Sequence, residues 1–117
     1  MNNNFPAMAS RMFTPAKILY CEVVNNKGFT EKNFVEDENI FFIAFSNFQG
    51  TEKIIDDVLF VEDTAKICMP FVENFSSANR IKLLDDSSEW EILGTPENWN
   101  MQNLFLLFKV RRIKGGA

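Results

Sequence analysis

The stretch Arg80–Gly116, RIKLLDDSSEWEILGTPENWNMQNLFLLFKVRRIKGG, divides into three β-strand signals joined by two polar turns. In the first two signals, at 80–84 and 89–93, apolar residues alternate with charged ones, which is typical of a strand with one buried face. The third signal, at 104–113, has apolar residues at a spacing of two: Leu104, Leu106, Phe108 and Val110. We therefore expect 104–113 to be the central strand of an antiparallel sheet.

Three further strand signals precede this stretch, at 16–24, 39–45 and 61–69. The run 39–45 (NIFFIAF) is nearly all apolar, so both of its faces need cover, from a loop or from another subunit. The pattern at 29–37 is weaker and fits either a ragged strand or a loop. Short strands at this spacing predict an all-β fold, a small antiparallel β-barrel of about six strands, or a sandwich.

The remaining segments predict an N-terminal arm and one long loop. Residues 1–14 have no sustained period, and we expect an arm there, ahead of a single barrel domain at 15–117. Phe5 and Phe13 suggest that the arm lies on a neighbouring subunit, although a frayed terminus fits equally well. The segment 46–60 is the expected loop, and the alternative is an amphipathic helix that caps one end of the barrel.

Composition argues against several classes of function. The chain has 16 Asp and Glu against 12 Lys and Arg, which disfavours nucleic-acid binding through a basic surface. No apolar run approaches the roughly 20 residues that span a bilayer. The first ten residues lack the basic start and apolar centre of a signal peptide, so we expect a product of the cytoplasm with no membrane partner.

The sequence also lacks the residues of a catalytic site. It has no histidine, which removes the commonest general base and the commonest metal ligand. Cys21 and Cys68 have no metal-ligand spacing, and we expect both to stay reduced. We therefore predict no catalytic residue, no metal and no cofactor, and a protein that is not an enzyme.

The C-terminal stretch carries a resemblance to a known family. Its features are an Arg-Ile pair at Arg80, an acidic turn, an aromatic-Glu-Ile strand that ends at Gly94, a Pro-Glu-Asn loop at Pro96, and a strand that closes on KVRRIKGG (109–116). Together they resemble the head closure proteins of tailed phages, also called head–tail connector or stopper proteins, found in siphophages and prophages of Gram-positive bacteria. A weaker similarity runs through EDTAKI (62–67).

The resemblance implies a small β-barrel that assembles into a ring, twelve-fold in the family, in the virion neck. Such a protein is made in the host cytoplasm. Its ring would meet the portal or adaptor ring above and the tail completion or terminator protein below. Packaged DNA would pass through the channel without sequence-specific contact, and a mildly acidic wall suits a conduit through which DNA must slide.

By position, the resemblance assigns the family's channel and gating loop to the segment 48–58. Its residues are Phe48, Gln49, Gly50, Thr51, Glu52, Lys53, Ile54, Ile55, Asp56, Asp57 and Val58. Head-to-tail packing in a ring also needs two different complementary patches on each subunit. The candidates for such contacts with neighbours are Phe5, Phe13, Glu36, Asp37, Glu38, Trp99, Arg111, Arg112 and Lys114.

Alternatives remain open for these contact residues. The acidic segment at 36–38 and the basic end at 111–114 also fit a solvated surface. Trp99 lies in a polar loop, where it fits a binding centre or packing over the barrel end equally well. Trp90 alternates with glutamates, and we expect it in the core.

Two other functions remain open. A tail completion or tail terminator protein of the same neck also forms a ring, and it should carry a longer C-terminal helix. An oligonucleotide-binding β-barrel would need aromatic residues interleaved with Lys and Arg on one sheet face. In this chain most strand aromatics alternate with acidic or apolar residues instead.

Overall fold

A computed structural model of the chain describes residues 6–55 and 58–113, with the backbone alone described over 47–55 and 58–62. Within these ranges the regular secondary structure is almost entirely β-strand. The strands are β1 (Thr14–Asn26), β2 (Phe29–Glu36), β3 (Phe41–Ile55), β4 (Val58–Pro70), β5 (Arg80–Leu83), β6 (Glu89–Asn98) and β7 (Phe105–Arg112). The helices are short 3-10 turns, η1 (Ala7–Arg11) and η2 (Trp99–Met101). The predicted all-β antiparallel fold is therefore confirmed.

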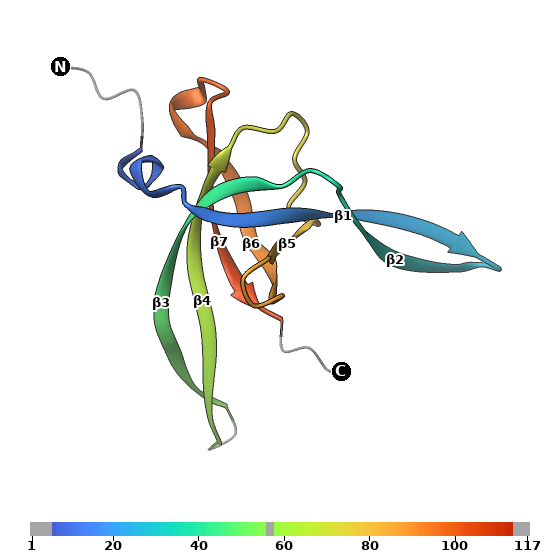
Figure 1. Cartoon of the computed structure of the whole chain (residues 1–117). Coiled ribbons are helices and arrows are strands. Elements are labelled where there is room, and N and C mark those ends of the chain that lie inside the picture. Colours follow the sequence, from blue (N-terminus) through green and yellow to red (C-terminus); the bar gives the residue numbers. More distant parts are fainter. Residues whose placement is uncertain (1–5, 56–57, 114–117) are drawn as a thin grey trace.

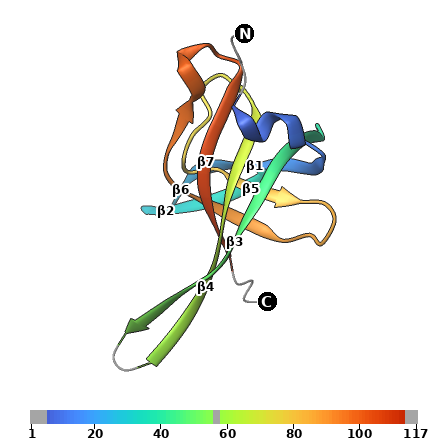
Figure 2. The same ribbon diagram turned by 90° about the vertical axis from the view of Figure 1, so that its left-hand side faces the viewer.

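The strands close into a ring (Figure 1 and Figure 2). Neighbours pair antiparallel in the order β1-β3-β4-β7-β6-β5, and β5 pairs back to β1 through Ala16–Leu19 and Arg80–Leu83. β2 pairs with β1 and extends it as a hairpin beside the ring. β1 and β7 are three strands apart in either direction, so they lie on opposite sides of the ring.

The ring encloses one apolar core, built from inward-facing residues that alternate along each strand. Its buried members are Ala16, Ile18, Ile43, Ala65, Ile67, Met69, Ile81, Leu83, Trp90, Leu106, Phe108 and Val110. Burying one large side chain of this kind stabilises the fold by about 1.5–3 kcal/mol. Trp90 is 4% exposed and packs edge-on against Phe45, which confirms its predicted core position. Leu104, placed on the same face by the sequence, lies ahead of β7 and is exposed.

A second apolar cluster lies outside the ring, under η1. Ala44, Cys68 and Leu107 point outward from β3, β4 and β7, and all three are buried. Met8 and Met12 from the N-terminal segment pack over them. The η1 part of the predicted arm therefore packs on the ring of its own chain, while a contact of Phe5 and Phe13 with a neighbour stays a prediction. The η1 part also supplies some of the cover that the apolar run 39–45 requires.

Two hairpins project from the ring (Figure 1). The β1–β2 hairpin turns at Lys27 and Gly28, whose φ values of 50° and 87° are those of a type I′ turn. The pattern at 29–37 is thus a strand. The β3–β4 hairpin stays paired as far as Ile55 and Val58, with one register shift between Phe48 and Thr51.

The segment 46–60 therefore differs from both expectations, an open loop and a capping helix. It is paired strand up to Ile55 and from Val58 onward. The ladder between β3 and β4 satisfies backbone N–H and C=O groups that an open loop would leave to water. Asp56 and Asp57 lie outside the described residues.

The hairpins make the molecule elongated. Its extents are 53 × 40 × 26 Å, and the Cα radius of gyration is 15.8 Å, against about 13.4 Å for a compact domain of this length. A two-stranded ribbon is marginally stable in water without a third strand or a packing partner. Both hairpins are therefore candidates for contact with other molecules.

Candidate functional site

The predicted gating segment Phe48–Val58 forms most of the far half of the β3–β4 hairpin. β3 and β4 are paired there from Thr51 and Glu62 to Ile55 and Val58. The hairpin extends well beyond the ring (Figure 1). Between Glu52 and Asp63 the sequence has five acidic residues and one lysine, so this hairpin concentrates the negative charge of the chain.

The β1–β2 hairpin has one acidic and apolar face, which we call the hairpin face. Residues directly opposite each other in an antiparallel pair share a face. On this face the pairs are Tyr20 with Val35, Glu22 with Asn33, Val24 with Glu31, and Asn26 with Phe29. All eight side chains are exposed, and Phe29 is 73% exposed. Neither Glu22 nor Glu31 forms an ion pair with any described residue.

The opposite face of the same hairpin is tied to the ring. The guanidinium of Arg80 lies 3.8 Å from the ring centroid of Phe34. The buried Asn79 side chain accepts a hydrogen bond of 3.0 Å from the backbone N–H of Cys21. These contacts fix the base of the hairpin through one face and leave the hairpin face uncovered.

Glu36 adds a third tie between the hairpin and the ring. It accepts a hydrogen bond of 2.9 Å from Lys82 and one of 3.4 Å from Lys17. The hydrogen bond from Lys82, more than any other contact, lowers the pKa of the Glu36 carboxyl, and the Lys82 pKa is raised in turn. Asp37, the next residue, accepts a 3.5 Å hydrogen bond from Asn39. Glu36 and Asp37 are thus engaged within their own subunit, while Glu38 is exposed.

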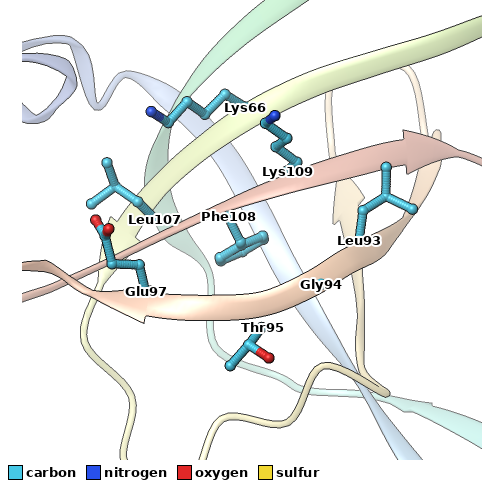
Figure 3. Close-up of a pocket in the computed structure, with 8 residues that line it drawn as sticks. All are labelled: Lys66, Leu93, Gly94, Thr95, Glu97, Leu107, Phe108 and Lys109. Atoms are coloured by element: carbon cyan, nitrogen blue, oxygen red, sulfur yellow. The ribbon is translucent and has the colours of Figure 1, made fainter.

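A shallow hollow lies on the outer face of β4, β7 and β6, and we call it the basic hollow (Figure 3). It forms where the β6–β7 ladder shifts register between Leu93 and Glu97. Gly94 permits this shift, since it adopts a φ of +77° that other residues disfavour. The volume is about 270 Å³, and the lining includes Lys66, Leu93, Thr95, Glu97, Leu107 and Lys109.

Two lysines outnumber the one carboxylate in the lining, Glu97, and give the basic hollow a net positive charge. Lys66 on β4 and Lys109 on β7 are directly opposite each other in the ladder, and like charges in that position are destabilising. Neither ammonium has an ion pair within the described part of the chain. In Figure 3 both side chains lie on the β4 and β7 side of the hollow. The arrangement favours an anionic group supplied from outside.

The contact predicted for the basic end of β7 stays a prediction, and its residues differ in how they are engaged. Arg111 donates a hydrogen bond of 2.7 Å from Nε to Glu91 on β6, so this charge is engaged inside the subunit. Arg112 is exposed, and its charge acts on the nearby carboxyl of Asp86. The pKa of Asp86 is lowered mainly by hydrogen bonds from Ser88, and the charge of Arg112 adds to that effect. Lys114 lies outside the described residues.

The aromatic candidates divide between surface and packing. Phe13 is 76% exposed, as a contact residue would be. Trp99 is half-buried and packs against the outer apolar cluster, and its contact with a neighbour stays a prediction. Phe5 lies outside the described residues.

Sequence reasoning missed the hairpin face and the lysine pair. The alternation from Tyr20 to Val35 was a usable signal for the hairpin face, once 29–37 is taken as a strand. The pairing of Lys66 with Lys109 depends on which strands are neighbours and in which register. Spacing along the chain does not contain that information.

The described residues contain no group of three or more His, Cys, Asp or Glu able to hold a metal ion. No helix among them is long and apolar enough to cross a membrane.

Comparison with known proteins adds a likeness of fold. No protein-family model and no curated protein matches the chain. Among solved structures, the solution structure of protein SF1141 from Shigella flexneri 2a is similar, with a TM-score of 0.58 and 10% sequence identity. The match covers 92% of this chain and 96% of that chain. At this identity the likeness shows a shared fold over nearly the whole chain.

Proposed function

We propose that this protein is the head closure subunit of a tailed phage, a structural protein of the virion neck. Copies of it form a ring, twelve-fold as in the family that it resembles, below the portal or adaptor ring. The ring extends and gates the DNA channel and presents the surface on which the tail docks. The proposal needs no catalytic residue and no cofactor.

The β3–β4 hairpin is the observation that carries the proposal. It projects from the ring at the segment that the resemblance assigns to the gate (Figure 1). The strands of the hairpin continue from β3 and β4 residues in the core, such as Ile43 and Ile67. A subunit of this shape combines a rigid body with a long projection, which a gated channel requires.

The hairpin also suggests how the gate would work. The register shift between Phe48 and Thr51 interrupts the ladder near the ring, and such bulges bend a ribbon locally. The acidic residues between Glu52 and Asp63 would repel DNA phosphates. In this mechanism the hairpins converge in the channel to hold packaged DNA and swing aside when the tail attaches.

The test uses DNA-filled heads that carry portal and adaptor but lack head closure protein. A shortened variant removes Gln49–Asp63 and joins the paired residues Phe48 and Thr64 through Asn-Gly, a two-residue hairpin turn. We expect the wild-type protein to bind heads and retain DNA, and the shortened variant to bind heads that leak. A full-length variant with Glu52→Gln and Glu62→Gln keeps the length of the hairpin and removes two of its charges. It therefore separates the effect of hairpin length on DNA retention from the effect of hairpin charge.

The tail completion alternative predicts a different result in the same experiment. A protein of that class would ignore heads and bind purified tails. Failure of the wild-type protein to bind heads would therefore overturn the head closure proposal, and tail binding would support the alternative. Affinity for single-stranded DNA that falls steeply with salt would instead favour an oligonucleotide-binding barrel.

A further inference from the structure

We propose that copies of this chain associate head to tail, with the hairpin face of one copy docked in the basic hollow of the next. This inference rests on the proposed function, which requires a contact between subunits, and it deepens that function by naming the two surfaces that meet. It also replaces the contact expected between the acidic segment 36–38 and the basic end 111–114. Glu36 and Arg111 in those segments already bind partners in their own subunit.

Charge complementarity is the first argument. The hairpin face carries two carboxylates, Glu22 and Glu31, and the basic hollow carries two ammoniums, Lys66 and Lys109, against one carboxylate, Glu97. Neither the two hairpin carboxylates nor the two ammoniums have an ion pair among the described residues. Docking would also remove the cost of placing two lysines opposite each other, because each would gain a carboxylate.

Apolar fit is the second argument. Phe29 stands next to the turn of the β1–β2 hairpin and is 73% exposed. The basic hollow is lined by Leu93, Leu107 and Phe108, and its volume is about 270 Å³. Small-molecule sites usually measure roughly 300–1,000 Å³, so the hollow suits one large side chain. Glu31 is two residues from Phe29 on the same face, within reach of the rim when Phe29 is inserted.

The placement of the two surfaces is the third argument. The hairpin extends β1, whereas the basic hollow is centred on β7, on the opposite side of the ring. One subunit can therefore offer its hairpin to one neighbour and its hollow to another at the same time. A contact between two different patches is heterologous, and repetition of it generates a ring or a filament. The marginal two-stranded ribbon gains a packing partner.

Two reciprocal charge variants test the contact on the full chain. One carries Glu22→Lys and Glu31→Lys, and the other carries Lys66→Glu and Lys109→Glu. We expect the wild type to self-associate in low salt at protein concentrations up to the millimolar range. Sedimentation velocity and cross-linking measure this association, which should weaken as the salt concentration rises. Each variant alone should lose association by about tenfold or more. An equal mixture of the two should regain it, since each hairpin then meets a hollow of opposite charge.

Controls separate the contact from general charge effects. Lys32→Glu changes the other face of the same hairpin, and Glu38→Lys changes an exposed residue of the segment first expected to bind. Both should associate as the wild type does. Phe29→Ser should weaken association without lowering thermal stability, because Phe29 is exposed in the single subunit. Circular dichroism checks that each variant is folded. If a double variant is not folded, the single change Glu31→Lys or Lys109→Glu is used in its place.

Three outcomes would overturn the inference: a wild-type chain that stays monomeric, variants that associate unchanged, or a mixture that fails to recover. Loss of head binding by the hollow variant, with its self-association intact, would assign the hollow to a head component and also overturn it. The head closure proposal is judged separately, by DNA retention in heads given the wild-type protein. Either can therefore fail while the other holds.

Discussion

Trp90 shows how single residues hold the ring together. Its indole N–H donates a hydrogen bond of 2.8 Å to the hydroxyl of Ser88, and Ser88 donates one of 2.6 Å to Asp86. Ser88 is itself buried. The polar atom of the largest core side chain is thus satisfied through a turn, and the same turn sets the register of β5 against β6.

Replacement of Ser88 by Ala tests this chain of hydrogen bonds. The change leaves the buried Trp90 N–H without its acceptor, and an unsatisfied buried donor costs about 1–3 kcal/mol. We expect the free energy of unfolding to fall by that amount in urea denaturation followed by tryptophan fluorescence. Ser77→Ala, at an exposed site, is the matched control and should change little. Equal stability of the two variants would contradict the assigned role of Ser88.

η1 shows how one short element completes the outside of the ring. It covers Cys68, which points outward from β4 and is fully buried. Burial raises the pKa of this thiol, so the reactive thiolate is scarce at neutral pH. η1 has no fully buried residue and no side-chain cap, and it is held mainly by Met8 and Met12.

The reactivity of Cys68 therefore reports on η1. In a Cys21→Ser background, Cys68 of the otherwise unchanged protein should react slowly with a thiol reagent at neutral pH. The change Met8→Ser with Met12→Ser removes the apolar cover, and we expect the rate to rise by about tenfold or more, since reaction requires exposure of the thiolate. The control is Met101→Ser, which alters an exposed methionine. An unchanged rate would mean that η1 does not protect the thiol.

The strands were predictable from the sequence where apolar residues alternate with polar or charged ones along the chain. Ile81 and Leu83, Trp90 and Ile92, and Leu106, Phe108 and Val110 face the core, as their spacing of two predicts. The β3–β4 hairpin was not predictable, because the segment 52–60 has helix-like spacing in the sequence, whereas its described residues are strand that pairs across the hairpin. The candidate surfaces needed the register as well, since Lys66 and Lys109 are far apart in sequence.

At the scale of the whole molecule, charged residues link strands that the apolar core does not join. Glu36 connects β2 to β1 through Lys17 and to β5 through Lys82. β2 lies beside the ring, and the hairpin face leaves its other side open. The orientation of the β1–β2 hairpin, and with it the proposed subunit contact, therefore depends on these ion pairs together with Arg80 and Asn79.

Acid should weaken this link in a defined direction. The pKa of Glu36 is lowered in the folded state, chiefly by its hydrogen bond with Lys82. A lowered carboxyl pKa contributes stability that is present above the unfolded value, about 4.3, and is lost as pH falls through the folded pKa. We expect the stability difference between the wild type and Glu36→Gln to be measurable at pH 7 and to disappear on acidification. Urea denaturation across that pH range measures it. Glu38→Gln, which changes an exposed carboxylate two residues away, should follow the wild-type profile. A wild-type advantage over Glu36→Gln that persists in acid would show that the Glu36 charge is not what fixes the hairpin.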